Sequence, residues 1–342
     1  MLPAMTTQYG TRPTMKDVAA RARVGLKTVS RVVNDEPGVT PATADRVRSA
    51  ITELGFRRND SARMLRKGRT ASVGLLLEDI GDPFYSVLSR AVEAVARFHG
   101  SLLFTGSSAE HPQRERELAL AFCARRVDGL VIVPAGDDHR YLLPELAAGT
   151  AAVFVDRPAE QIEADAVLSD NAGGAREGTE HLLRHGHRRI GFLGDQPQIH
   201  TAGERLRGYR EAMAAAGLPV DPGQVVMGPT DPAAVSAALD RLTTGPRPVT
   251  ALLTGNNRIT LEVLRRLPAL AYRPALVGID DLELAELLVP GLTVVAQDPA
   301  GLGRTAAELL FRRLDGDTSA PRTVRLPTRL IPRGSGETDA PD

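Results

Sequence analysis

Hydrophobic positions follow two different periods along this chain. In the first 70 residues, apolar side chains recur every three or four positions, which is the spacing of one buried helix face. Beyond residue 70, short continuous apolar runs alternate with amphipathic stretches such as 87–99 and 114–126, a pattern typical of buried parallel strands joined by helices. The chain is therefore predicted to have a doubly wound α/β body behind a small all-α head. The predicted strands are 72–79, 101–106, 129–134, 151–156, 189–194, 251–255 and 275–280.

Capping residues locate the first two helices of the head. Thr14 with Asp17 three residues later resembles a capping box and predicts a helix over 15–22. A turn at 23–25 separates it from a second helix over 26–33, which contains three buried valines. Because valine is a poor helix former, packing against neighbours must hold this second helix in place.

Two more helices are predicted in the head. Thr40 is an N-cap followed by Pro41 at the first helical position, and an apolar stripe continues from there to Gly55. Asn59 is the expected cap of a last short helix over 60–67. The head thus reads as a bundle of short helices.

The formal net charge of zero hides an asymmetry between head and body. Residues 1–70 contain 14 Lys and Arg against 6 Asp and Glu, a net charge of +8, which leaves −8 on the remainder. A basic head on an acidic body indicates that the head meets a polyanion. Two helices joined by a tight turn fit the major groove of DNA. The pattern alone leaves open a small helical bundle with a solvated basic face.

The run TMKDVAARARVGLKTVSRVVNDEPGVTPATADRVRSAITELGFRRNDSARMLRKG closely resembles the DNA-binding head of the LacI/GalR family of bacterial transcription regulators. The spacing of the family's motifs is intact over the whole run. The resemblance implies a helix-turn-helix domain over 1–57 and a hinge helix with linker over 58–70. Arg23 stands where the family usually has a turn glycine, and Gly25 stands where it usually has a serine cap.

The same resemblance assigns roles on DNA. It implies that the second helix reads base edges and that a leucine of the hinge helix wedges into the minor groove and kinks the operator. For Arg31, a contact to phosphate alone is the second interpretation. The implied base readers are Leu26, Lys27 and Arg31, the implied phosphate contacts are Thr28, Ser30 and Asn34, and the DNA-binding set also includes Thr14, Asn59, Ala62, Arg63 and the wedge Leu65.

Polar side chains stand directly after the apolar runs of the body. Ligands of doubly wound sheets bind past the carboxyl ends of the strands, so these side chains are candidates for a binding site. Carboxylates and amides with one aromatic ring suit a sugar, with a nucleoside as the second possibility. For any single residue, the alternative is a cap on the next helix. The candidates are Asp79, Asp82, Phe84, Asp156, Arg157, Asp170, Asn171, Asn256, Asn257, Asp280, Gln297 and Asp298.

The body also resembles the regulatory module of the LacI/GalR family, which is similar to a two-lobed periplasmic sugar-binding protein. Motifs such as DIGDPFY, VDGLVIVP, VFVDRP, RLRGY and VGIDD carry this resemblance. It implies an effector-binding and dimerisation domain over 71–334 with two lobes and an intervening cleft. The first lobe is expected at about 71–169 and 299–322, the second at about 170–298 and 323–334, and a disordered tail at 335–342.

Positions of the cleft follow residue by residue from the resemblance. Arg205 matches an arginine that clamps the effector, Asp280 a cleft aspartate, and Phe84 a ring-stacking aromatic. The resemblance also matches Asp156 to a strand-end aspartate and Asn256 to a cleft asparagine. Three strand-end residues that it does not assign complete the set. The predicted effector site is Asp82, Phe84, Asp156, Arg157, Arg205, Asn256, Asp280 and Gln297.

Three histidines raise the question of a metal. His181 and His185 are four positions apart on a predicted helix, and His187 follows closely. No carboxylate or cysteine is spaced along the sequence to complete a ligand set, so a structural role is favoured over zinc. We expect neither a metal nor a cofactor.

An enzyme is the opposing class of function, because doubly wound domains often catalyse reactions. The chain has no GxSxG elbow, no Walker motif and no GxGxxG after the first predicted strand. A carbohydrate-active enzyme with a DNA-binding head is the second interpretation, and turnover of a bound sugar would distinguish it.

Taken together, these patterns predict a homodimeric transcription regulator, a repressor rather than an enzyme. Each head is expected to read one half of a near-palindromic operator, and a small sugar-like effector in the cleft to change operator affinity. The chain has no apolar run of about 18 residues and no hydrophobic signal core. We therefore expect a cytoplasmic protein without a membrane partner.

Overall fold

The computed structural model describes residues 13–56 and 69–341. The chain divides between Arg69 and Thr70 into two compact units, called here the head and the body. Within the described ranges, no helix is long and apolar enough to cross a membrane.

The described part of the head is built from α1 (Met15–Ala22), α2 (Leu26–Val33) and α3 (Pro41–Leu54), and these three predicted helices are confirmed. The Asp17 carboxylate accepts hydrogen bonds from the backbone N–H and the hydroxyl of Thr14, both at 2.7 Å, so the cap predicted at this position is formed. The helices share one small core, to which each contributes. Its buried members are Val18, Ala22, Val29, Val47 and Ala50.

The turn between α1 and α2 contains Arg23 at the position where the family usually has a glycine. Arg23 adopts the left-handed conformation with φ 54°, and its N–H donates to the carbonyl of Ala20. A non-glycine residue in this region costs roughly 1–2 kcal/mol, which the packing of the two helices must offset. The predicted helix over 60–67 lies outside the described residues.

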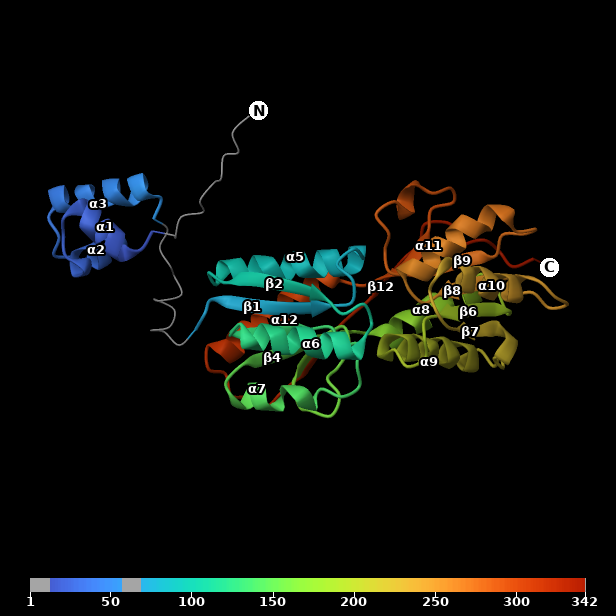
Figure 1. Ribbon diagram of the computed structural model, residues 1–342. Coiled ribbons are helices and arrows are strands. Elements are labelled where there is room, and N and C mark those ends of the chain that lie inside the picture. The colour runs from blue at the N-terminus through green and yellow to red at the C-terminus, as the bar shows by residue number, and fades with distance from the viewer. Residues whose placement is uncertain (1–12, 57–68, 342) are drawn as a thin grey trace, which may run out of the picture. The chain divides into compact units, whose positions relative to one another are not determined.

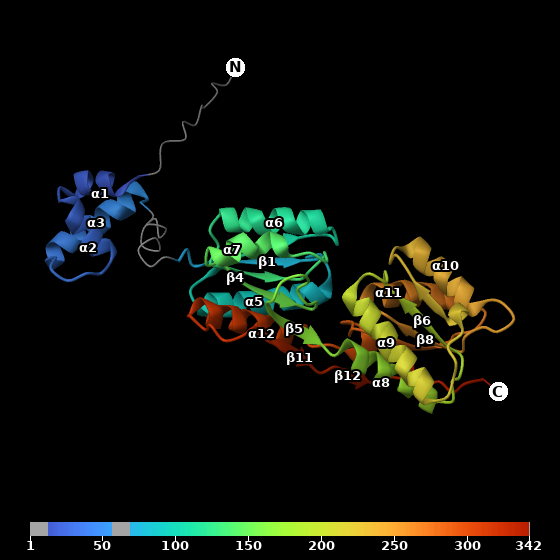
Figure 2. The same ribbon diagram turned by 90° about the horizontal axis from the view of Figure 1, so that it is seen from below.

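The body has two lobes, each with its own six-stranded sheet (Figure 1). In the first sheet the order is β11-β5-β4-β3-β1-β2, and all neighbouring strands are parallel. Helices α6 and α7 lie on one face and α5 and α12 on the other (Figure 2). The elements are β1 (Ser72–Leu77), α5 (Pro83–Phe98), β2 (Leu102–Ser107), α6 (Pro112–Ala124), β3 (Gly129–Ile132), α7 (Leu143–Ala147), β4 (Ala151–Val155), β5 (Asp165–Ser169), α12 (Pro299–Leu314) and β11 (Thr323–Leu326).

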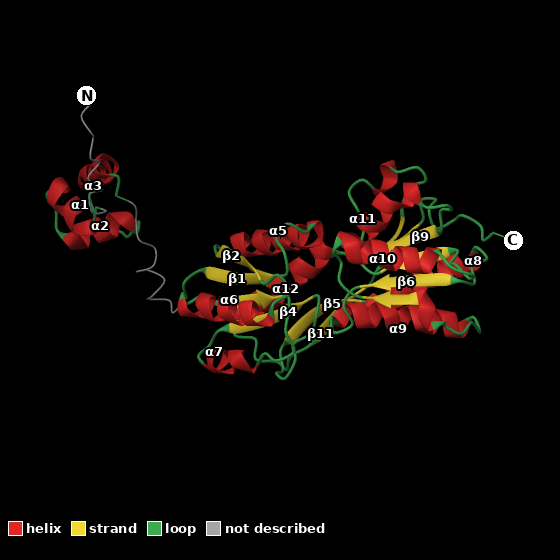
Figure 3. Ribbon diagram, turned by 45° about the vertical axis from the view of Figure 1, so that its right-hand side comes forward, coloured by secondary structure: helices red, strands yellow, loops and turns green. Residues whose placement is uncertain are grey.

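The second sheet has the order β12-β10-β9-β8-β6-β7 and is parallel except for β12, which runs antiparallel to β10. Figure 3 shows α10 and α9 on opposite sides of β6. The elements are α8 (Asn171–Arg184), β6 (Ile190–Gly194), α9 (His200–Ala215), β7 (Val225–Met227), α10 (Pro232–Thr243), β8 (Ala251–Thr254), α11 (Asn257–Arg266), β9 (Ala275–Ile279), β10 (Thr293–Ala296) and β12 (Arg329–Ile331), with 3₁₀ helices at Arg140–Leu142, Pro222–Gln224, Leu267–Ala269 and Ala285–Leu287.

All seven predicted strands are present in these sheets. Most read as continuous apolar runs because helices cover both faces, as in β1, β3 and β9, where every residue is buried. Parallel strands place their carboxyl ends at one edge of each sheet. The residues that follow them therefore meet between the lobes.

The chain crosses between the lobes after β5, after β10, and between β11 and β12. β11 pairs in parallel with β5 in the first sheet, with Thr323 opposite Ala166. The predicted lobe boundary at 323 was therefore wrong, and 323–326 belong to the first lobe. A strand joins a sheet through hydrogen bonds to a partner distant in sequence, which a local pattern does not reveal.

The prediction of a disordered tail was wrong for residues 335–341. Ser335 donates from its backbone N–H to the carbonyl of Gly291 at 2.9 Å and from its hydroxyl to the carbonyl of Leu276 at 2.6 Å. The carbonyl of Thr338 contacts His187 Nε2 at 2.8 Å. This segment, called here the C-terminal segment, is thus fixed to the second lobe by partners more than 40 residues earlier in the chain.

Candidate DNA-recognition helix and interlobe cavity

The outer face of α2 carries the polar and basic side chains expected of a recognition helix. Val29 points into the head core, whereas Lys27 is exposed and Leu26 is 45% exposed at the first helical position. An exposed leucine at this point offers an apolar contact to a thymine methyl group. Among the described residues, neither Lys27 nor Arg31 forms an ion pair, so both charges are free to meet phosphate or base edges.

The remaining predicted DNA contacts divide into two groups. Thr28, Ser30 and Asn34 are half-buried, and Asn34 Nδ2 donates to Ser30 Oγ at 3.3 Å, while Thr14 is exposed. The hinge positions lie outside the described residues; these are Asn59, Ala62, Arg63 and Leu65.

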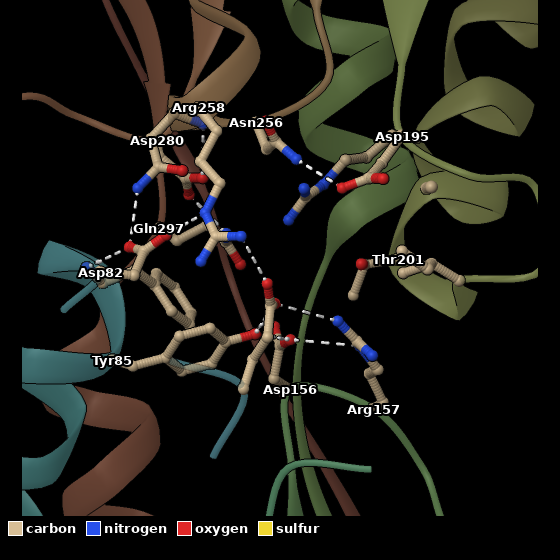
Figure 4. Close-up of a pocket in the computed structure, with 16 residues that line it drawn as sticks. Asp82, Tyr85, Asp156, Arg157, Asp195, Thr201, Asn256, Arg258, Asp280 and Gln297 are labelled. Atoms are coloured by element: carbon tan, nitrogen blue, oxygen red, sulfur yellow. Dashed lines mark hydrogen bonds and ion pairs between the residues drawn. The ribbon is translucent and has the colours of Figure 1, made fainter. Parts of the chain in front are cut away.

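A cavity of about 50 Å³ lies between the two lobes, where the carboxyl ends of both sheets face one another (Figure 4). All eight side chains predicted for the effector site line it, although they come from positions spread over more than 200 residues. The lining is Glu78, Asp82, Phe84, Tyr85, Asp156, Arg157, Asp195, Ile199, Thr201, Ala202, Arg205, Asn256, Asn257, Arg258, Asp280 and Gln297.

The first lobe contributes an aromatic and acidic wall. Asp82 caps α5 by accepting from the N–H of Phe84 at 2.9 Å, which sets the start of the helix. Phe84 and Tyr85 meet edge to face with ring centres 5.1 Å apart. The Tyr85 hydroxyl donates to Glu78 at 3.2 Å and lies 3.4 Å from Asp156.

Asp156 and Asp280 occupy matching positions in the two lobes. Each follows a central strand, and each has a left-handed backbone, with φ 69° for Asp156 and φ 77° for Asp280. Such strain at a non-glycine residue persists only where surrounding packing imposes it. Both carboxylates are buried, and burial raises the pKa of each above its usual value, while the Arg205 charge opposes the rise.

Arg205 is the central cation of the second lobe. It is 6% exposed, and it donates from Nε to Asn171 Oδ1 and from a terminal nitrogen to the carbonyl of Gly255, both at 2.7 Å. Asn256 caps α11 by accepting from the N–H of Ile259 at 2.9 Å. These bonds fix the side chains before any ligand arrives.

Hydrogen bonds join neighbouring strand ends in the second lobe. Asn256 Nδ2 donates to Asp195 at 2.9 Å, and Gln297 Nε2 donates to Asp280 at 2.6 Å. Burial raises the pKa of Asp195. The second-lobe side of the cavity thus holds two hydrogen-bonded pairs of an amide with a carboxylate.

Arg258 crosses from the second lobe into the acidic wall of the first (Figure 4). Its guanidinium contacts Glu78 at 2.9 Å, Asp79 at 3.2 Å and Asp82 at 3.2 Å. Next to it, Asn257 Nδ2 donates to Asp82 at 2.8 Å. These contacts, called here the Arg258 bridge, hold the lobes together and fill part of the cavity.

Glu78 is another acid of this wall whose pKa is raised. Burial and then the neighbouring Glu110 raise its pKa to about 8, against the opposing charges of Arg258 and Arg157. Burial also acts on Glu110, but the hydrogen bonds and charge of Arg157 hold the pKa of that carboxyl below its usual value. Because the pKa of Glu78 is raised and that of Glu110 is lowered, a proton on this pair is held more favourably by Glu78 than by Glu110.

A second cavity of about 410 Å³ adjoins the first, and Arg157 and Ile199 line both. Its walls come from loops that follow strands of both lobes, including Gly136 and Gln196. Arg157 stands at the junction, where it donates to Glu110 and to the carbonyl of Pro134. Together the two spaces fall within the range of about 300–1,000 Å³ that is usual for small-molecule sites.

Sequence reasoning missed seven of the sixteen residues that line the cavity. Asp195 directly follows a predicted strand, so the strand-end rule could have included it. Tyr85, Thr201 and Arg258 lie on helices, where nothing local marks them. Conversely, Asp170 and Asp298 cap α8 and α12 by accepting from Gly173 and Gly301, and they fall outside the lining of the cavity.

The cavity offers acceptors, donors and an aromatic face in close proximity. Carboxylates accept from ligand hydroxyls, Arg205 donates charge-assisted hydrogen bonds, and Phe84 presents an apolar ring. These are the groups that a polyhydroxylated ring requires.

Two protein-family models match separate parts of the chain. The model described as "Bacterial regulatory proteins, lacI family" matches residues 14–59, and the model of a periplasmic binding protein-like domain matches residues 179–336. The HTH-type transcriptional regulator CelR of Thermobifida fusca is 38% identical over 343 residues, covering 95% of this chain and 98% of CelR. The chain belongs to the LacI family. It is a DNA-binding transcriptional regulator.

Two solved structures are similar over nearly the whole regulator. The CelR–cellobiose complex is 34% identical, with a TM-score of 0.68, and the match covers 95% of this chain and all of that one. The lac repressor dimer bound to operator and the anti-inducer ONPF is 26% identical, with a TM-score of 0.82, covering 96% and 100%. The two-lobed α/β fold and the helix-turn-helix head predicted from the sequence are thereby confirmed.

Proposed function

We propose that this regulator represses transcription as a homodimer, and that a sugar-like effector in the interlobe cavity changes its affinity for a near-palindromic operator. In this proposal it acts in the cytoplasm, where it reaches chromosomal DNA, and it releases its effector unchanged rather than acting as an enzyme. Base reading is assigned to α2, and effector binding to the eight predicted cavity residues.

One observation carries the effector proposal. The eight predicted residues come from both lobes, and Asp82 and Asp156 of the first lobe line the same cavity as Arg205 and Asp280 of the second. A ligand placed there touches both lobes at once. It can therefore bind one lobe arrangement better than another, which is what a shift in operator affinity requires.

The size of the effector follows from the two adjoining cavities. The inner one, at about 50 Å³, is too small for a sugar ring while Arg258 fills part of it. The outer one adds about 410 Å³ and is polar at its rim. We assign a disaccharide-sized ligand to this site, in line with the cellobiose in the CelR complex.

Exposed apolar side chains support the homodimer. Phe98 is 87% exposed and Leu102 is 69% exposed at the start of β2, and Leu287 is 70% exposed in the second lobe. Large exposed apolar side chains are typical of a surface that a partner covers. The lac repressor structure described above is a dimer.

The test is fluorescence-anisotropy binding of the full chain to its own upstream intergenic DNA, at fixed salt and with scrambled competitor. Cellobiose and other disaccharides, monosaccharides and nucleosides are added in turn, and each ligand is recovered and analysed for chemical change. Palindrome-dependent binding that an unchanged disaccharide alters supports the proposal. Binding that no ligand alters, or rapid turnover of the ligand, contradicts it.

A further inference from the structure

We propose that His181, His185 and Glu337 form a zinc site that fastens the C-terminal segment to the end of α8. The site shares no residue with the interlobe cavity or with α2. No carboxylate is spaced along the sequence so as to complete a ligand set with these histidines, which was a reason to expect no metal. The fold supplies one, because it brings Glu337 to His181 across 156 residues.

The three side chains converge on one point. His181 lies in the last turn of α8 and His185 is the C-cap residue, so a spacing of four places both rings on one helix face, with centres 4.9 Å apart. Glu337 accepts a hydrogen bond from His181 Nε2. One ligand atom from each residue lies within 4.8 Å of the other two, so small side-chain adjustments bring all three to one ion.

The donor set fits zinc. Two imidazole nitrogens and one carboxylate oxygen leave a fourth tetrahedral position for water or for Asp339, whose Oδ1 lies 3.9 Å from His185 Nδ1. The His181 side chain is 8% exposed, and those of His185 and Glu337 are 29% and 25% exposed. The site is thus sheltered but reachable from solvent.

The surroundings orient the carboxylate and favour a cation. The Glu337 carboxylate accepts from the Thr293 hydroxyl at 2.8 Å and from the backbone N–H of Gly334, which fixes it as outer-shell partners fix metal ligands. The carbonyl end of α8 carries a partial negative charge that also stabilises a cation. His187 differs from the other two, because its nitrogens are occupied by Thr250 and the carbonyl of Thr338, and its role is structural.

The test is a zinc titration of the untagged full chain after removal of metal with a chelator, read by calorimetry and by competition with a chromogenic zinc chelator. We expect one zinc per chain. His185→Gln and Glu337→Gln each remove a ligand and should weaken binding at least about tenfold, since even outer-shell partners are worth 10–100-fold. His111→Gln, an exposed histidine outside the cluster, should bind zinc as the unaltered chain does.

Amide hydrogen exchange provides the second readout. Zinc should slow exchange at residues 337–340 in the unaltered chain and in His111→Gln, but not in His185→Gln. A hydrogen-bonded histidine and glutamate without a metal would give no stoichiometric zinc binding, and equal zinc affinity in His185→Gln would show that zinc binds elsewhere. Either result overturns the proposal. DNA binding is measured separately in zinc-free buffer, so failure of the zinc site leaves the proposed function untouched.

Discussion

Arg258 of the second lobe donates from its Nε to the Asp82 carboxylate of the first lobe at 3.2 Å. The same carboxylate caps α5, so the bond ties the start of a first-lobe helix directly to α11. Because Arg258 also reaches Glu78 and Asp79, one side chain joins three acids across the cleft. This one charged side chain therefore contributes directly to the arrangement of the lobes.

Replacing Arg258 with Ala should open the lobes. The substitution removes the cation through which the second lobe attracts three acidic groups of the first lobe, so less attraction opposes separation of the lobes. We expect a larger radius of gyration in small-angle X-ray scattering without effector. Arg265→Ala is the matched control, because Arg265 lies on the same helix but pairs with Glu262 of its own lobe. Identical scattering of the Arg258 variant and the unaltered chain would contradict the role of the bridge.

Arg205→Lys should remove the response to effector but keep operator binding. Lysine retains the charge but loses the planar fork that donates to Asn171 and Gly255 while facing the cavity. We expect a loss of about 1.5–3 kcal/mol in the free energy of effector binding, which makes binding roughly 10–100-fold weaker. Calorimetry measures this change. Arg207→Lys, two positions along the exposed face of α9, should have no effect. An unchanged effector affinity in Arg205→Lys would argue against this residue as a ligand clamp.

Lys27→Ala and Arg31→Ala distinguish base contacts from phosphate contacts. Loss of a base contact weakens binding to the cognate operator by about 1–3 kcal/mol and changes binding to scrambled DNA little. Loss of a phosphate contact weakens binding to both kinds of DNA alike. We expect the selective loss for both residues in anisotropy measurements at fixed salt. Arg48→Ala, an exposed residue of α3 that pairs with Asp45, is the control. An equal loss of affinity for all DNA sequences would show that the residue contacts the phosphate backbone and not the bases.

Glu78→Gln should flatten the pH dependence of stability. The pKa of Glu78 is about 8 in the folded protein against an ordinary 4.5. Between these values the folded state binds more protons than the unfolded state, so this carboxyl lowers the free energy of unfolding as pH rises. The free energy of unfolding is measured with urea at pH 5.5 and pH 8.5. The difference between the two values should be smaller in the variant by at least roughly 2 kcal/mol. Glu93 is exposed on α5, and Glu93→Gln should leave the pH dependence of stability unchanged.

Leu287→Asp should weaken the homodimer. A carboxylate placed in an apolar contact must be desolvated when a partner covers it, at a cost of several kcal/mol. Light scattering coupled to gel filtration should show a shift towards monomer at micromolar concentrations. Leu143→Asp changes an exposed leucine of α7, outside the proposed surface, and should remain dimeric. A dimeric Leu287 variant would place the interface elsewhere.

The sequence by itself determined those features that depend on near neighbours. Thr14 with Asp17 marked the start of α1, because this cap is a contact between residues three apart, and Pro41 at the first helical position marked the start of α3. Continuous apolar runs located the central strands, since burial on both faces leaves no room for polar positions. The strand-end rule then gathered seven of the eight predicted effector residues, because parallel strands all end at the same edge. Arg205, which lies on α9, came from the family resemblance.

Only the tertiary structure decided which distant segments meet. β11 joined the first sheet by pairing with β5, Arg258 reached the opposite lobe, and Glu337 arrived beside His181. Each of these contacts links residues more than 150 positions apart. Such contacts depend on how whole lobes and strands pack, and a local pattern of side chains contains no record of that packing.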